Sequence, residues 1–92
     1  MNTELAIPHK PALNPLFRMQ YETAQKSHVL LYPEGMVKLN DSASQILLLC
    51  DGSRTVDEIV NELERKFGLS NLGPDITHML AESTRRNWLI DA

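Results

Sequence analysis

The sequence predicts an α+β domain in which a three-stranded antiparallel sheet precedes a cluster of three helices. Two observations support this prediction. Short β-prone segments occupy residues 17–39, and helical capping residues with apolar side chains at helical spacing follow in residues 40–87. Strands that are segregated from helices in this order favour packing of the helices on one face of the sheet, and a small sheet with three helices is also the shape of a winged-helix domain.

Three segments of the first half are expected to be strands. Residues 17–22 alternate between apolar and polar side chains, as a half-buried strand does. Residues 29–31 and 36–39 are apolar and β-prone, and Pro33 with Gly35 suits a type I turn between them. These two strands would form a hairpin whose last strand is an open edge of the sheet, which is a place for another chain to bind.

Capping residues mark the three helices. The first helix is expected to begin near Asn40 to Ser42, where Ser42 with Gln45 fits a capping box, and to stop at Asp51-Gly52. The second is expected to begin at the capping box of Thr55. The third begins beside Pro74, which is tolerated in a first helical turn. Residues 88–90 close the chain, either as a last helical turn or as a short strand.

One domain accounts for the length of 92 residues, which can bury one small core. Residues 1–15 contain Pro8, Pro11 and Pro15 and are expected to form a flexible N-terminal arm, because proline bars a helix and favours extended backbone. Residues 16–92 would then form the single folded domain.

The sequence holds no residue pattern typical of an active site or a metal site. His9, His28 and His78 are scattered without metal-ligand spacing, and no nucleophile motif or phosphate-binding loop is present. The single cysteine, Cys50, follows three leucines and is expected to be a small buried hydrophobe, which fits a reducing compartment. We therefore expect no enzymatic activity, no metal and no cofactor.

The charge balance disfavours nucleic acid as a partner. The formal net charge is −3, from 9 basic and 12 acidic residues, whereas nucleic-acid binding depends on contacts from Lys and Arg to phosphates. Residues 1–10 show no secretory signal, and the longest apolar run, residues 46–50, is too short to span a bilayer. We expect a protein of the cytoplasm that does not bind membranes.

The end of the third helix carries two features of interest. Arg85 and Arg86 form a tight basic pair, which is favourable at the negative end of a helix dipole and is compatible with capture of an acidic partner. Trp88 is the sole tryptophan. It is expected to cover the core, with a place beside a binding groove as the alternative.

Sequence motifs along nearly the whole chain, from Pro11 onward, resemble those of a known family. The turn formed by residues 32–35, which leads into residues 39–40, is the most specific part of this resemblance. On these motifs the chain resembles the PqqD family, the small peptide chaperones of pyrroloquinoline quinone (PQQ) biosynthesis. Asn87 is a departure, because the family often has glycine before the tryptophan. The matching residues are Arg18-Met19-Gln20-Tyr21-Glu22, Val29-Leu30-Leu31-Tyr32-Pro33-Glu34-Gly35, Leu39-Asn40, Ala43, Ile46-Leu47, Asp51-Gly52, Thr55-Val56, Ile59-Val60, Leu63, Asp75, Leu80 and Asn87-Trp88-Leu89.

The resemblance implies a function without catalysis. Members of this family bind the precursor peptide PqqA and present it to the radical SAM enzyme PqqE, which joins a glutamate and a tyrosine of the peptide. They resemble the recognition domains of peptide-modifying enzymes (RiPP recognition elements), which bind leader peptides by strand addition between the third strand and the third helix. The peptide-binding residues expected on this basis are Met36, Val37, Lys38, Leu39, Met79, Leu80, Ser83, Arg86 and Asn87.

Two other functions are alternatives. A winged-helix DNA-binding regulator would read DNA with the third helix, although that helix also carries Asp75 and Glu82. A small enzyme or cofactor carrier has the least support, because no redox or metal centre is recognisable. A monomer suffices for the role of the family, while an open strand edge also permits a weak or domain-swapped homodimer.

Overall fold

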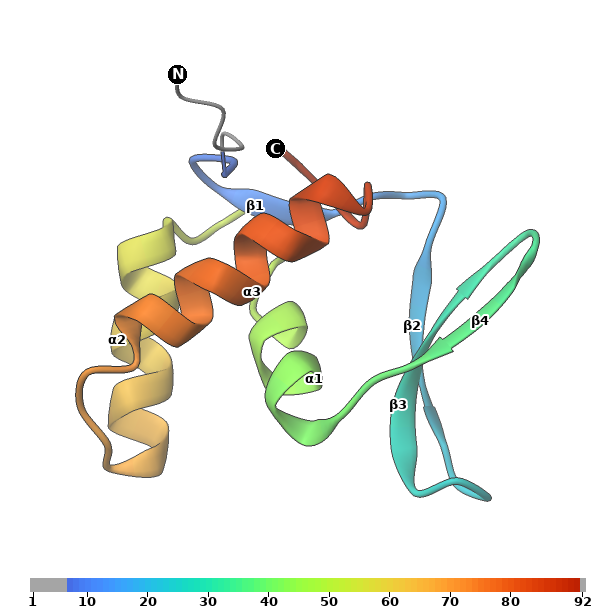
Figure 1. The fold of residues 1–92 in the computed structure, drawn as a ribbon, viewed down its shortest axis with the longest axis horizontal. Helices are drawn as coiled ribbons and strands as arrows, with labels where there is room; N and C mark the ends of the chain where they lie inside the picture. Colours follow the sequence, from blue (N-terminus) through green and yellow to red (C-terminus); the bar gives the residue numbers. More distant parts are fainter. Residues whose placement is uncertain (1–6, 92) are drawn as a thin grey trace.

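A computed structural model describes residues 7–91 of the chain (Figure 1). The expected α+β class is confirmed, because a three-stranded antiparallel sheet is followed by three helices. Among the described residues the elements run in the order β1 (Pro11–Leu13), β2 (Arg18–Glu22), β3 (Ser27–Tyr32), β4 (Gly35–Lys38), α1 (Asp41–Leu48), α2 (Val56–Phe67), α3 (Gly73–Arg85) and β5 (Leu89–Asp91).

The main sheet has the strand order β2-β3-β4, so β3 is central and the other two strands are its edges. Arg18 pairs with Leu31 between β2 and β3, and Leu30 pairs with Val37 between β3 and β4. Figure 1 shows this sheet to one side of the three helices, with the chain passing from β4 directly into α1. The sheet contacts the helices mainly where β3 packs against α1.

The expected flexible arm is corrected in part by a second, two-stranded sheet. Of residues 1–15, Pro11–Leu13 form β1, which pairs antiparallel with β5 at the end of the chain. The other side of β1 is also paired, because its Pro11 carbonyl accepts from Gly52 N–H at 2.9 Å. This pairing confirms the short strand as the correct alternative for the closing residues. Residues 1–6 lie outside the described part of the chain.

Asn40 and Thr55 are the N-caps of α1 and α2, so the capping box expected at Ser42 and Gln45 is wrong. The Asn40 side chain accepts from Ala43 N–H at 2.7 Å, and Thr55 forms the complete capping box of α2 with Glu58. Leu72 precedes α3 without a side-chain cap, and proline occupies the first turn. The predicted end of the first helix is wrong, because α1 ends at Leu48, ahead of Gly52.

Cys50 lies in the hydrophobic core, as expected. Its thiol donates to the carbonyl oxygen of Ile46 at 3.4 Å, and burial raises the pKa of the Cys50 thiol to about 12. In the described part of the chain, no helix has the length and apolar character needed to cross a bilayer. The core combines the sheet with all three helices through Leu30, Leu39, Ile46, Leu47, Cys50, Ile59, Leu63, Ile76, Leu80 and Leu89.

Candidate functional site

The outer edge of β4 has no partner strand within residues 7–91, since β4 pairs only with β3. An unpaired strand edge presents backbone N–H and C=O groups that an extended peptide can satisfy. Peptide binding at this edge depends on which backbone groups of Gly35–Lys38 point away from the sheet.

One hydrogen bond sets that direction. The N–H of Leu39 donates to the carbonyl oxygen of His28 at 2.9 Å, immediately after β4. In an antiparallel ladder, hydrogen-bonded and non-hydrogen-bonded pairs alternate. With the observed pairing of Leu30 and Val37, the backbone of Val37 also points toward β3. The backbone groups of Met36 and Lys38 therefore point away from the sheet, toward the open edge.

The side chains of β4 alternate between the two faces of the sheet. Met36 is 47% exposed and Lys38 is also exposed, whereas Val37 is half-buried and packs against the core. Across the sheet, Lys38 pairs with Val29 and Met36 pairs with Leu31. A strand added to β4 would thus meet Met36 and Lys38 on one face and Val37 on the other.

Three of the residues expected to contact the peptide are buried in the structure. Leu39 lies after the end of β4 and is buried, and Leu80 and Ser83 are buried on the inner side of α3. The Ser83 hydroxyl donates to the carbonyl oxygen of Met79 at 2.8 Å, so its hydrogen-bonding capacity is used within the helix. The burial of Leu80 and Ser83 is explained by packing, because α3 is covered by α1, α2 and β5.

The remaining expected residues, on α3 and directly after it, are more accessible. Met79 is half-buried, and Arg86 and Asn87 are exposed. The guanidinium carbon of Arg86 lies 5.5 Å from the centre of the Trp88 ring, in a cation–π arrangement. Asn87 adopts a left-handed backbone with φ 65°, at the departure from the family pattern.

In the structure, β4 and α3 are not packed closely together, although they were expected to form the two walls of the peptide-binding site. Helix α3 makes its main contacts with α2, β5 and α1, and β4 makes its main contacts with β3. The accessible residues of β4 and of α3 thus form two separate sets. A peptide held by both would have to bridge them.

The basic pair at the end of α3 is partly neutralised. Arg85 and Arg86 both form ion pairs with the carboxylate of Glu82. A hydrogen bond from Arg85 lowers the pKa of the Glu82 carboxyl and raises the pKa of the Arg85 guanidinium. Within residues 7–91, no group of three His, Cys, Asp or Glu side chains is placed to hold a metal ion.

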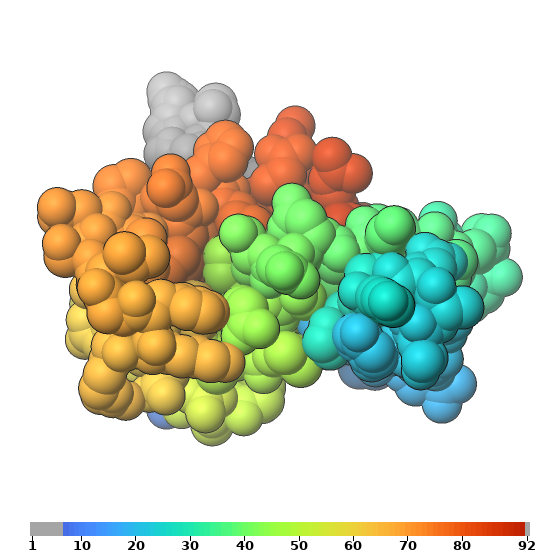
Figure 2. Space-filling view, turned by 90° about the horizontal axis from the view of Figure 1, so that it is seen from below, coloured from blue at the N-terminus to red at the C-terminus, as the bar shows by residue number. Residues whose placement is uncertain are grey.

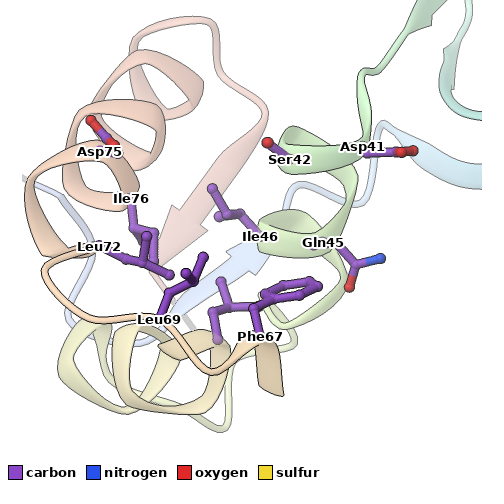
Figure 3. A pocket seen from close by; sticks show the side chains of 10 residues that line it. Asp41, Ser42, Gln45, Ile46, Phe67, Leu69, Leu72, Asp75 and Ile76 are labelled. Carbon is purple, nitrogen blue, oxygen red and sulfur yellow. The ribbon is translucent and has the colours of Figure 1, made fainter. Parts of the chain in front are cut away.

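A concave surface among the three helices was not expected from the sequence. This groove has a volume of about 490 Å³ and lies between α1, the end of α2 and the start of α3 (Figure 3). The signal that could have indicated it is Leu69, an apolar residue directly after the helix-ending Gly68. The groove is lined by Asp41, Ser42, Gln45, Ile46, Leu63, Phe67, Leu69, Leu72, Asp75 and Ile76.

Comparison with known proteins identifies the family. Residues 27–89 match the family model of "Coenzyme PQQ synthesis protein D (PqqD)", which is more than half of the chain. The chain belongs to the PqqD family. The matched region includes the β3–β4 hairpin, all three helices and the first residue of β5.

Curated relatives of this PqqD-family chain share about half of its residues. A "PqqA binding protein" of Methylococcus capsulatus is 48% identical over 77 residues, which are 84% of this chain and 83% of the relative. A protein of the same name from Pseudomonas fluorescens is 51% identical over 80 residues, covering 86% and 88% of the two chains.

A solved structure has the same fold. It is the solution structure of the PqqD part of Methylobacterium extorquens PqqCD, described as a functional, stand-alone RiPP recognition element. The TM-score is 0.72 at 32% sequence identity, and the match covers 87% of each chain.

Proposed function

We propose that this chain is a peptide chaperone of PQQ biosynthesis in the cytoplasm, which binds the precursor peptide PqqA and presents it to the radical SAM enzyme PqqE. It contributes no catalysis and carries no cofactor. One copy is sufficient for this role, and any homodimer would be weak or domain-swapped. The names of the relatives, which are PqqA binding proteins, support the choice of peptide.

The observation that carries the proposal is the open edge of β4. Its outward backbone groups, on Met36 and Lys38, can form a ladder with an extended peptide, and main-chain hydrogen bonds of this kind give affinity without a deep pocket. Alternate peptide side chains would then lie beside Val37 on the inner face and beside Lys38 on the outer face.

The burial pattern divides the expected site into two groups. Met36, Val37 and Lys38 would contact the peptide from β4. Met79 would contact it from α3, and Arg86 and Asn87 from the residues that follow α3. The three buried residues, Leu39, Leu80 and Ser83, would hold these two elements in place through the core rather than touch the peptide.

Amide hydrogen exchange tests strand addition directly. Binding of PqqA to the ¹⁵N-labelled protein should slow exchange at the amides of Met36 and Lys38, because both would become hydrogen-bonded. The amide of Val37 already faces β3, so its exchange should change much less. The alternating pairing also directs the amide of Tyr21 outward, on the opposite edge of the sheet, and makes it an internal control. Protection at Tyr21 without protection at Met36 and Lys38 would place the peptide on β2 and contradict the proposal.

A DNA-binding role has less support. Glu82 forms ion pairs with both arginines of the basic pair on α3, and the formal net charge of the chain is −3. This role would require binding to duplex DNA at low salt, with an affinity that falls steeply as the salt concentration rises.

A further inference from the structure

The groove between α1, α2 and α3 has an apolar interior and a polar rim. Figure 3 shows Ile46, Phe67, Leu69 and Ile76 directed into the space between the helices, with Asp41 and Asp75 at its margins. Figure 2 shows the face on which α1 lies between the end of α2 and the strands of the sheet.

The walls of this groove are unusually open to solvent for such large apolar side chains. Phe67 is 49% exposed and Leu69 is 57% exposed. A site for a small molecule normally encloses most of its ligand. Two half-exposed walls suit a side chain that projects from a protein surface and covers them, and the volume of about 490 Å³ has room for a bulky one.

The charge at the rim indicates what kind of surface fits. Asp41 lies in the first turn of α1 and Asp75 in the first turn of α3, and both are exposed. Neither is among the ion pairs that the described residues form. The nearby ammonium of Lys66 donates to the neutral Gln45 amide oxygen at 2.8 Å and keeps its positive charge, so two carboxylates stand against one cation. The rim is therefore acidic on balance and complements a cationic segment.

We infer that this groove docks a segment of the partner enzyme in which a bulky apolar side chain lies beside Lys or Arg. The inference rests on the proposed function, which requires an enzyme to receive the peptide. The groove is separate from the open edge of β4, so peptide and enzyme can bind together. It also begins where β4 ends, because Asp41 on its rim follows Lys38 by three positions. The bound peptide and the docked segment would lie next to each other.

Calorimetry with PqqE, in the presence of saturating PqqA, tests the apolar part of the groove. A variant with Phe67→Ser and Leu69→Ser should bind PqqE about tenfold more weakly or worse, as expected for loss of interface anchors, and should retain its affinity for PqqA. Leu48→Ser is the matched control, because Leu48 is also 49% exposed but does not line the groove. Its affinity for PqqE should equal that of the wild type.

Charge variants test the rim and do not disturb the apolar walls. Asp41→Asn with Asp75→Asn should weaken PqqE binding by about two- to fivefold and reduce its salt dependence. Asp57→Asn is the control, since Asp57 is exposed in the first turn of α2 and lies outside the groove. This control should leave both the affinity and its salt dependence unchanged.

Three outcomes would overturn the inference. Unchanged PqqE affinity in the folded Phe67→Ser, Leu69→Ser variant excludes the groove as the docking site. A shift in self-association of that variant, without a change in PqqE binding, makes a second copy of this chain the occupant. If the wild-type protein binds PqqA but not PqqE, PqqE is not the occupant of the groove, and the proposal of PqqA binding still stands. Failure to bind PqqA, in contrast, contradicts the proposed function itself.

Discussion

The backbone N–H of Leu39 donates to the carbonyl oxygen of His28 at 2.9 Å, and this single bond orients the backbone of the whole β4 edge. It makes Val37 part of the hairpin ladder and leaves Met36 and Lys38 free to bond outward. On the proposed function, neighbouring residues of β4 would have different roles, with Val37 in folding and Lys38 in peptide binding.

Proline substitutions at these two positions should separate the roles. Val37→Pro removes an N–H that bonds to β3 and should lower the free energy of unfolding by about 2 kcal/mol or more. Lys38→Pro removes an outward N–H and should leave the stability nearly unchanged while it weakens PqqA binding. Urea denaturation and peptide titration measure the two effects. Equal loss of stability in both variants would show that the alternation is misassigned.

Truncation on α3 should distinguish core residues from contact residues. Leu80→Ala removes a fully buried side chain and should cost about 3 kcal/mol of unfolding free energy, because it leaves a cavity. Met79→Ala, in the preceding position, removes a half-buried side chain and should cost clearly less. Urea denaturation compares them. If the folded Met79→Ala protein binds PqqA as tightly as the wild type, Met79 is not part of the peptide site.

The left-handed backbone of Asn87, with φ 65°, predicts a preference for residues that tolerate this region. Asn87→Gly should be neutral or slightly stabilising, and Asn87→Val should lower the unfolding free energy by about 1–2 kcal/mol. Both variants keep the hydrogen bond from the Asn14 amide, since it is accepted by the backbone carbonyl of residue 87 at 2.9 Å. Thermal denaturation would reveal the difference, and equal melting temperatures would contradict it.

The capping box of α2 should make the free energy of unfolding depend on pH in the acidic range. A hydrogen bond from the Thr55 backbone lowers the pKa of the Glu58 carboxyl below its ordinary value of 4.5. A carboxyl with a lowered folded-state pKa stabilises the fold above its unfolded-state pKa, and this contribution is lost as the pH falls through the folded-state pKa. Glu58→Gln cannot titrate, so its stability should fall less steeply than that of the wild type below about pH 5.

Urea denaturation between about pH 7 and pH 3 measures this difference. Glu34→Gln is the control, because Glu34 lies in the exposed turn of the β3–β4 hairpin. It should follow the acid dependence of the wild type. A Glu58→Gln profile that also follows the wild type would show that the cap carboxylate does not contribute to the acid dependence.

Local signals in the sequence were sufficient for most of the elements. The caps at Asn40 and Thr55 act on N–H groups three positions along the chain, so they can be recognised without knowledge of the fold. The alternation of Met36, Val37 and Lys38 and the family motifs in the hairpin are also local. Together they were enough for the α+β class, the open edge and the family.

Pairings between distant segments could not be predicted in the same way. Nothing near Pro11–Leu13 indicates that this segment pairs with Leu89–Asp91, because the register depends on where three helices place the end of the chain. The groove has the same origin, since its walls come from three different helices.

The sequence by itself thus determined the β2–β4 sheet, the three helices, their order and the family of this protein, because periodicity and capping act within one or two turns of chain. Only the tertiary structure decided which side of each element is buried. It placed Leu39, Leu80 and Ser83 in the core and left Lys38 and Asn87 exposed, because burial depends on which neighbours pack against an element.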